Sequence, residues 1–218
     1  MPRWETVRAS ADSVHIWRAD LAAVGEGLED LLCAAELARA AQIVPQRRRA
    51  EWTRSRGVLR ALLARYLSAD PRELRFALGP YGKPALHREV PGKARNPRGP
   101  AASDLRFNLS HSGNLALVAV SSGREVGVDV ERPRARHTAE FLRAWVAREA
   151  TVKCDGGGLL ASSQGFRPPG PLEEGRCRKG SSPRADLWTA ALDLGPHAVA
   201  AVAVEGGECR LALREWRD

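Results

Sequence analysis

The chain has 218 residues, 44% of them apolar, and a formal net charge of +8 at pH 7. This length can bury a substantial core, either as one domain or as two small halves. No run of 18 apolar residues occurs, and the first residues lack the charged-then-apolar order of a secretory signal. We therefore expect no membrane partner. The positive charge suits a nucleic acid, an acidic protein or a polyphosphate ligand, and by itself it does not choose among them.

The four cysteines are far apart in the sequence and form no C-x-x-C pair. This spacing argues against a zinc site or a disulfide framework, and it predicts reduced thiols in a cytoplasmic protein. The four are Cys33, Cys154, Cys177 and Cys209.

The N-terminal part predicts one strand followed by two helices. Residues 14–18 alternate as a strand does, and apolar residues recur at helical spacing over 27–41 and again over 50–67. Pro71 ends the second helix, because the residue before a proline is pushed out of the helical region. Ser55 falls inside the apolar stripe of that helix. Its hydroxyl could bond back to its own helix or contact a ligand.

The middle of the chain predicts turns and loops between short strands. Residues 74–77 could form a short strand, and residues 79–84 form a turn cluster that holds Lys83. The Pro- and Gly-containing stretch 88–104 and the Pro-, Gly- and Ser-rich stretch 162–184 predict long loops.

The C-terminal part predicts a helix and a hairpin. Residues 139–153 read as a helix that the glycines from Gly156 onward end. Residues 198–204 and 209–213 alternate and are separated by Gly206-Gly207, which predicts a β-hairpin.

Two carboxylates fall on one face of a predicted strand over 126–131. In a strand successive side chains alternate, so Asp129 and Glu131 point one way while Val128 and Val130 point into a core. Two neighbouring carboxylates are costly unless a cation lies between them, and ligation by oxygen alone suits Mg²⁺. The strand therefore predicts a metal site.

Two further stretches carry polar chemistry. Residues 107–113 read Phe-Asn-Leu-Ser-His-Ser-Gly and precede an apolar run, and they predict a turn whose hydroxyls, imidazole and flexible backbone could cradle a phosphate. On the predicted helix over 139–153, Glu149 and Lys153 are four residues apart, so a third carboxylate and a cation share one face.

These motifs follow one another in a characteristic order. Gly-Lys-Pro at 82–84, Phe-Asn-Leu-Ser-His-Ser at 107–112, Gly-Val-Asp-Val-Glu at 127–131 and the Trp-to-Lys segment 145–153 together resemble the 4′-phosphopantetheinyl transferases of the surfactin-synthetase-activating type. The resemblance runs from about Val14 to Trp216. Each motif alone is weak, and the ordered set is specific. The chain departs from the pattern in two places: Arg148 stands where the family usually has lysine, and only thirteen residues separate Glu131 from Trp145.

The resemblance implies an α+β fold of two pseudo-symmetric halves, with coenzyme A bound in the cleft between them. Residues 1–105 would form the coenzyme A nucleotide side and residues 106–218 would carry the metal and catalytic residues of one monomeric unit. The implied reaction transfers the phosphopantetheine arm of coenzyme A to a serine of an acidic acyl or peptidyl carrier protein and releases 3′,5′-ADP. A nucleic-acid partner is not expected.

The resemblance also implies roles for individual residues. Asp129, Glu131 and Glu149 match the Mg²⁺ ligands. Glu149 also matches the general base, and Lys153 matches the cation that stabilises charge on the departing phosphate, so Asp129, Glu149 and Lys153 form the expected catalytic set. The residues expected to hold coenzyme A are Lys83, Ser110 and His111 at its phosphates, with Arg48, Arg54 and Ser55 toward the 3′-phosphate and adenine.

Three other functions fit parts of the same pattern. The three carboxylates could serve a Mg²⁺-dependent phosphohydrolase or nuclease, which would act without a carrier protein. The arginines could belong to a nucleic-acid-binding module, although aromatic residues make up only 6% of the chain and none of the usual recognition motifs is present. The short spacing before Trp145 would also fit a degenerate family member that binds coenzyme A without transferring its arm.

Overall fold

A computed structural model describes residues 7, 9–10, 12–79, 81–87, 104–133, 137–156 and 187–217. The two loops predicted over 88–104 and 162–184 lie outside these residues, apart from Asp104. In chain order the elements are β1 (Ser13–Asp20), η1 (Leu28–Leu31), α1 (Ala34–Ala41), α2 (Gln46–Leu67), β2 (Phe76–Leu78), β3 (Pro84–Leu86), β4 (Leu105–Ser112), β5 (Leu115–Ser122), β6 (Val126–Glu131), α3 (Ala139–Asp155), β7 (Leu187–Leu192), β8 (Val199–Glu205) and β9 (Arg210–Glu215).

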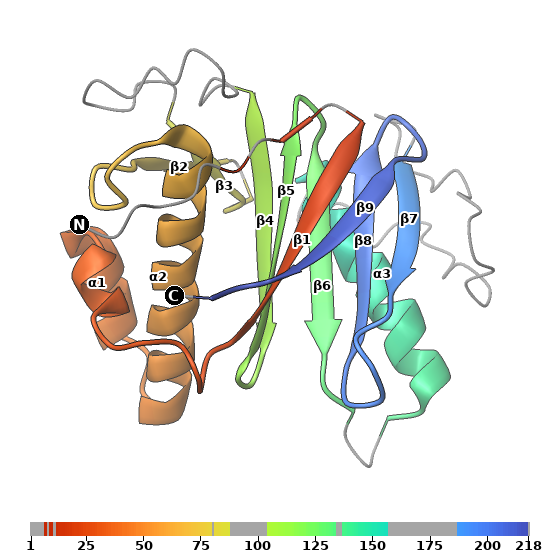
Figure 1. Ribbon diagram of the computed structural model, residues 1–218. Helices are drawn as coiled ribbons and strands as arrows, with labels where there is room; N and C mark the ends of the chain where they lie inside the picture. The colour runs from red at the N-terminus through yellow and green to blue at the C-terminus, as the bar shows by residue number, and fades with distance from the viewer. Residues whose placement is uncertain are drawn as a thin grey trace.

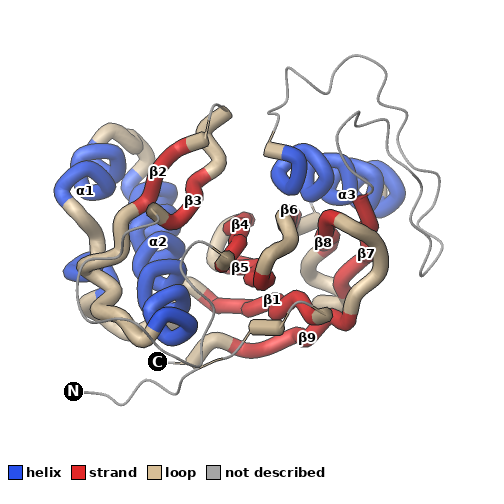
Figure 2. Tube along the Cα trace, turned by 90° about the horizontal axis from the view of Figure 1, so that it is seen from above, coloured by secondary structure: helices blue, strands red, loops and turns tan. Residues whose placement is uncertain are grey.

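The described elements form layers, with a helix at each outer side (Figure 1). A four-stranded sheet has the order β4-β5-β1-β9, a three-stranded sheet has the order β6-β8-β7, and β2 pairs with β3 alone. Helix α2 packs on one face of the four-stranded sheet, the three-stranded sheet packs on its other face, and α3 covers the outside of the three-stranded sheet (Figure 2). This confirms the predicted α+β class.

The layering explains why residues 115–120 are apolar without alternation. Strand β5 lies between β4 and β1, and both of its faces are covered. Ala116, Val118 and Val120 face the core under α2, whereas Leu117 and Ala119 face the core shared with the three-stranded sheet. A strand that is buried on both sides needs an apolar residue at nearly every position.

The division near residue 105 falls at the first residue of β4. The four-stranded sheet takes β1 from before this point and β4, β5 and β9 from after it. Strands from both parts of the chain therefore share one sheet, and the division stays a prediction.

Three local expectations were wrong. The predicted helix over 27–41 is broken into η1 and α1, because Leu32 is extended and Cys33 begins α1 with its backbone N–H bonded to Glu36 Oε2 at 3.1 Å. Residues 107–112 belong to strand β4, and the turn begins only at Gly113, whose φ is +58°. Residues 198–204 and 209–213 do not form a hairpin, because β8 and β9 are not paired with each other.

Strands β8 and β9 belong to different sheets. Strand β8 pairs with β6 and β7, whereas β9 runs parallel to β1. Gly206 and Gly207, with φ of +79° and +91°, lie where the chain crosses from one sheet to the other. Positive φ is cheap for glycine, so the pair marks a change of direction without specifying the partner strand. Strand β7 was not predicted.

No helix in the described ranges is long and apolar enough to cross a membrane. Cys33, Cys154 and Cys209 are free thiols. Cys177 lies outside the described residues.

Candidate active site

The edges of two sheets meet along β4 and β6. Each is the end strand of its own sheet, and polar side chains of β4 join them. Asn108 Oδ1 accepts a hydrogen bond of 3.0 Å from the backbone N–H of Val128, and Ser110 Oγ donates one of 2.8 Å to Asp129 Oδ1. The alternation of β6 is as predicted, because Val126, Val128 and Val130 lie in the inter-sheet core. Asp129 therefore faces away from that core.

Two residues further along each strand, Ser112 of β4 and Glu131 of β6 make the next contact between the two sheet edges. Ser112 Oγ donates to Glu131 Oε2 at 2.9 Å and accepts from the backbone N–H of Arg132 at 3.2 Å. Glu131 shares its side of β6 with Asp129, as the period of two predicts.

Helix α3 supplies a cation to the buried carboxylate. Lys153 Nζ lies 2.6 Å from Asp129 Oδ1, 3.1 Å from Ser110 Oγ and 3.4 Å from the carbonyl oxygen of Val128. The Asp129 side chain is only 7% exposed and that of Lys153 is 29% exposed, so this ion pair is partly desolvated. Together with Ser110, the pair connects β4, β6 and α3 at one point.

Glu149 lies one helical turn before Lys153 on the same face of α3. Burial raises the pKa of its carboxyl group, the negative charges of Asp129 and Glu131 raise it further, and Lys153 and Arg148 oppose the shift. A carboxylate with a raised pKa is a better proton acceptor near neutral pH than an exposed one.

The close approach of β6 to α3 depends on Gly127. A Cβ at this position would lie 2.0 Å from the carbonyl oxygen of Ala150 and 2.4 Å from the backbone N of Cys154. Only glycine lets the strand approach the helix backbone so closely. This contact holds Glu149 and Lys153 beside Asp129.

Two oxygen atoms of this cluster are buried and have no hydrogen-bond partner: Asp129 Oδ2 and Glu149 Oε1. Buried carboxylate oxygens are costly to leave without a partner. Among the described residues, however, no group of three His, Cys, Asp or Glu side chains is arranged to hold a metal ion. Asp129 Oδ1 is bonded to Lys153 and Glu131 to Ser112. The donor set of carboxylate oxygens still fits a hard divalent cation at the two oxygens without partners.

His111 lies apart from the serines with which the sequence groups it. Successive residues of β4 alternate, so His111 points to the opposite side of the strand from Ser110 and Ser112. Burial lowers the pKa of its imidazole, as does Lys153, while Glu51 and Glu131 oppose the shift. Its Nδ1 atom is buried without a partner.

Lys83 binds at the last turn of α3, next to Lys153, but its hydrogen bonds go to groups other than Asp129. Its Nζ donates to Glu125 Oε2 at 2.7 Å, to the carbonyl of Cys154 at 3.0 Å and to the carbonyl of Val126 at 3.2 Å. A cation near the last carbonyl groups of a helix is favourable. Lys83 thereby links the β2–β3 hairpin to the start of β6 and the end of α3.

The remaining expected coenzyme A residues lie on α2, and the structure does not bring them into the cluster. Arg48 is exposed, and Arg54 donates to the carbonyl of Leu21 at 3.1 Å. Ser55 is fully buried, and its hydroxyl donates to the carbonyl of Trp52 at 2.8 Å. The geometry therefore favours the bond back to its own helix and does not support a ligand contact for Ser55.

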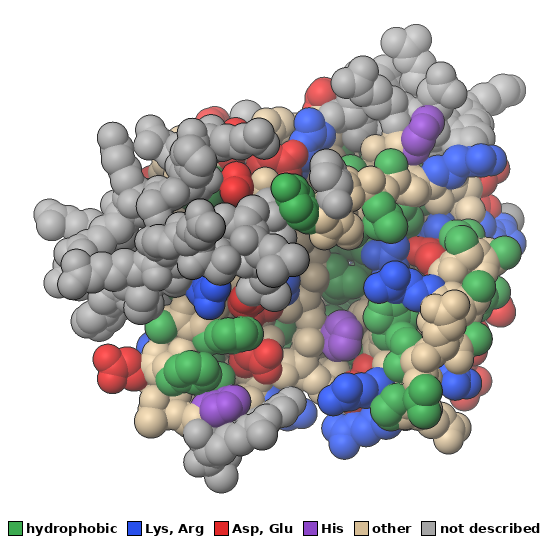
Figure 3. All heavy atoms as spheres, turned by 180° about the vertical axis from the view of Figure 1, so that it is seen from behind, with side chains coloured by type: hydrophobic (Ala, Val, Ile, Leu, Met, Phe, Trp, Pro, Cys, Tyr) green, Lys and Arg blue, Asp and Glu red, His purple; other side chains and the backbone are tan. Residues whose placement is uncertain are grey.

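Two arginines that were not among the expected site residues lie near the turn between β4 and β5. A Cβ placed on Gly113 would lie 3.6 Å from Arg132 Nη1 and 3.9 Å from Arg47 Nη2, so both guanidinium groups approach this turn. The two residues are far apart in the sequence, and no local pattern pairs them. Figure 3 shows basic, acidic and histidine side chains gathered on the face of the molecule seen from behind.

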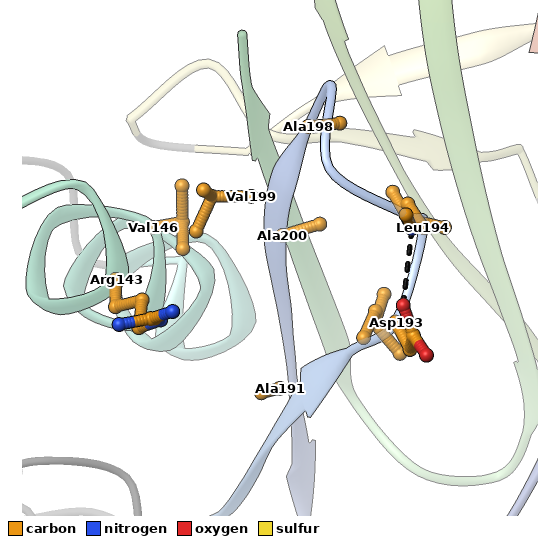
Figure 4. Close-up of a pocket in the computed structure, with 10 residues that line it drawn as sticks. Arg143, Val146, Ala191, Asp193, Leu194, Ala198, Val199 and Ala200 are labelled. Carbon is orange, nitrogen blue, oxygen red and sulfur yellow. Dashed lines mark hydrogen bonds between the residues drawn. The ribbon is translucent and has the colours of Figure 1, made fainter. Parts of the chain in front are cut away.

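A separate pocket of about 190 Å³ lies between α3 and the turn joining β7 to β8. It is lined by Arg143 and Val146 on the helix and by residues 193–195 of the turn, where the Gly195 N–H donates to Asp193 Oδ1 at 3.0 Å (Figure 4). None of the residues expected in the site lines this pocket.

Comparison with known proteins gives consistent results. No protein-family model matches the chain. It is 31% identical to 4′-phosphopantetheinyl transferase HetI of Nostoc sp. over 94% of this chain and 93% of that protein. It is 30% identical to the putative 4′-phosphopantetheinyl transferase slr0495 of Synechocystis sp. over 61% of this chain and 60% of that protein. The transferase Sfp of Bacillus subtilis is 24% identical over 50% of this chain and 53% of its own length.

Proposed function

This chain belongs to the 4′-phosphopantetheinyl transferase family, and we propose that it transfers the phosphopantetheine arm of coenzyme A to a serine of an apo acyl or peptidyl carrier protein. The serine oxygen would attack the phosphorus that bears the arm, and the bond from that phosphorus to the bridging oxygen would break. The products are the holo-carrier and 3′,5′-ADP.

The observation that supports this proposal most strongly is the convergence of Asp129, Ser110, Lys153 and Glu149 where β4, β6 and α3 meet. In the proposed mechanism Glu149 accepts the proton of the attacking serine hydroxyl. A serine hydroxyl is a weak nucleophile until a carboxylate within hydrogen-bond reach takes its proton. Lys153 supplies positive charge near the phosphate oxygens as the leaving group departs.

We assign Asp129, Glu131 and Glu149 as the side chains that hold Mg²⁺. The two buried carboxylate oxygens without partners, on Asp129 and Glu149, support this assignment. When bound, the ion would supply charge neutralisation at the pyrophosphate. Lys153 bonds to Asp129 Oδ1, whereas Oδ2 has no partner, so the lysine and the ion would compete for the charge of one carboxylate through different oxygens.

We further propose that residues 1–105 bind the nucleotide part of coenzyme A and residues 106–218 carry the reaction centre. Lys83, His111, Arg48 and Arg54 remain our proposed phosphate contacts, with Ser110 at the pyrophosphate. We leave Ser55 out because its hydroxyl is committed to its own helix. The surfactin-synthetase-activating subtype, a monomeric state and a cytoplasmic location are also proposals.

The carrier is proposed to be acidic. The formal net charge of +8 favours encounter with a negatively charged partner and would speed association at low ionic strength. The transfer rate should accordingly fall as salt is added.

The direct test is the mass of an apo carrier protein after incubation with the enzyme, coenzyme A and Mg²⁺. We expect a gain of one phosphopantetheine group, and loss of that gain when EDTA is added. Asp129→Asn and Glu149→Gln should each abolish the transfer while the circular dichroism spectrum stays unchanged. Full activity in either variant would refute the assigned site.

The same experiment without a carrier tests the other functions. Hydrolysis of coenzyme A in that reaction would identify a phosphohydrolase. Binding of coenzyme A with no transfer to several carriers would identify a degenerate binder, consistent with the seven-residue connection between β6 and α3.

A further inference from the structure

Helix α3 carries a line of side chains that leads to the proposed general base; Phe141 is exposed, and the other members are half-buried. Its members are four residues apart: His137 just before the helix, then Phe141, Trp145, Glu149 and Lys153. Neighbouring members at this spacing lie side by side, and each step of four residues turns about 40° around the axis because four residues exceed the 3.6 of one helical turn. We call the first three the aromatic line.

The three rings of the aromatic line contact one another in sequence. The ring of Phe141 lies 5.2 Å from that of His137 and is stacked on that of Trp145 at 6.2 Å. Rings at these separations attract one another, so the position of Phe141 is held by a neighbour on each side.

Phe141 is nevertheless 49% exposed. The helix packs on the three-stranded sheet through other residues, among them Val146, Ala147 and Ala150. The fold therefore does not need Phe141 for its core. Aromatic side chains are enriched at protein interfaces, so a half-exposed ring that contacts a neighbour on each side suits contact with a protein partner.

We propose that the aromatic line docks an apolar side chain on the helix of the carrier protein that presents the acceptor serine. This inference rests on the proposed function and adds the surface that the partner uses. Phe141 and Glu149 are eight residues apart, which is about 12 Å along the helix axis. A partner helix that brings its serine to Glu149 covers Phe141 with the residues one or two turns away.

The course of α3 supports this partner. Beyond Lys153 the helix ends at Asp155 and is capped by Gly156, so α3 extends further from Glu149 on the N-terminal side, where the aromatic line lies. The overall positive charge favours an acidic partner, as carrier binding in the proposed function requires.

The test compares Phe141→Ala with Leu213→Ala, which removes a side chain of equal exposure, 50%, from β9 in the other sheet. Transfer is measured at varied carrier and at varied coenzyme A concentrations. We expect Phe141→Ala to raise the KM for the carrier about tenfold or more, with kcat at saturating carrier and the KM for coenzyme A unchanged. Phe141→Leu should restore most of the affinity, and Leu213→Ala should match the wild type.

Direct binding provides a second measurement that needs no turnover. A carrier whose acceptor serine is replaced by alanine is labelled and titrated with each enzyme variant in fluorescence anisotropy. Weaker binding by Phe141→Ala alone supports the proposal. The proposal is overturned if Phe141→Ala leaves the KM and the affinity for the carrier unchanged, or if Leu213→Ala gives the same loss. It is also overturned if the KM for coenzyme A rises instead, because that result would place the pantetheine arm on the aromatic line. Absence of transfer by the wild-type enzyme would instead refute the proposed function.

Discussion

Replacing Gly127 with alanine should inactivate the enzyme mainly by moving α3. The new Cβ would lie 2.0 Å from the carbonyl oxygen of Ala150, whereas ordinary contacts begin at 3.4 Å. Strand and helix must therefore separate by about 1.4 Å in this region. The obstacle is backbone of both elements, so no side-chain rotation relieves it.

The displacement acts directly on the proposed reaction centre. Lys153 Nζ lies 2.6 Å from Asp129 Oδ1, and a shift of about 1.4 Å takes this pair beyond hydrogen-bond distance. Overpacking of this kind costs about 1–3 kcal/mol of stability. Misplacing reacting groups by about 1 Å costs roughly 100-fold in rate. We expect Gly127→Ala to lose both stability and transfer rate by about these amounts.

Gly57→Ala is the matched control. A Cβ on Gly57 would lie 2.6 Å from Leu28, where α2 packs on η1, so this variant is also overpacked but lies in another layer. Urea unfolding measures both stability losses, and transfer to a carrier at saturating substrates measures the rate per folded molecule. We expect a reduced rate only in Gly127→Ala. A wild-type rate in that variant, with stability lost, would refute the view that this contact positions the catalytic groups.

Three further outcomes are expected. Burial, together with Arg214 and Arg210, lowers the pKa of His15 to about 4. Between pH 6.5 and pH 4 the imidazole therefore takes up a proton in the unfolded chain but stays neutral in the folded chain. The contribution of His15 to the free energy of unfolding should be fully present above pH 6.5 and should fall by about 3 kcal/mol on acidification to pH 4. Urea unfolding of His15→Gln at the same pH values should largely lack this fall. Glu36→Ala should cost about 3–5 kcal/mol in urea unfolding, because it leaves the buried Arg60 without its carboxylate, 2.7 Å away. In metal-free protein, Lys153→Met should lower the melting temperature, and Mg²⁺ should raise it more in the variant than in the wild type; equal shifts would show that lysine and metal do not compete for Asp129.

The alternation of β6 could be read from the sequence because one of its faces is apolar throughout. Three valines at a period of two specify which side of the strand enters the core, and they place Asp129 and Glu131 on the other side. Glu149 and Lys153 could be related for a similar reason, since helical spacing alone puts them on one face. Local periodicity was sufficient in both cases.

The position of His111 could not be read in the same way. Its segment is rich in Asn, Ser and Gly, which are typical of turns, yet pairing with β5 in register from Leu105 to Ser112 makes it a strand. That pairing is set by residues outside the segment, and it separates His111 from Ser110. The partner of β9 was hidden likewise, because a Gly-Gly pair marks a change of direction and the choice of sheet depends on distant contacts.

The location of the reaction centre follows from how the two sheet edges are joined. Backbone pairing would bring β4 and β6 to about 4.8 Å and would satisfy their N–H and C=O groups without side chains. Here side chains make the joint instead: Asn108 accepts from the backbone of Val128, and Ser110 reaches Asp129. A joint made by side chains leaves a polar gap between the strands, and α3 closes it with Lys153. The polar side chains that join the two sheet edges therefore also create a partly desolvated place where carboxylates, a hydroxyl and an ammonium group meet.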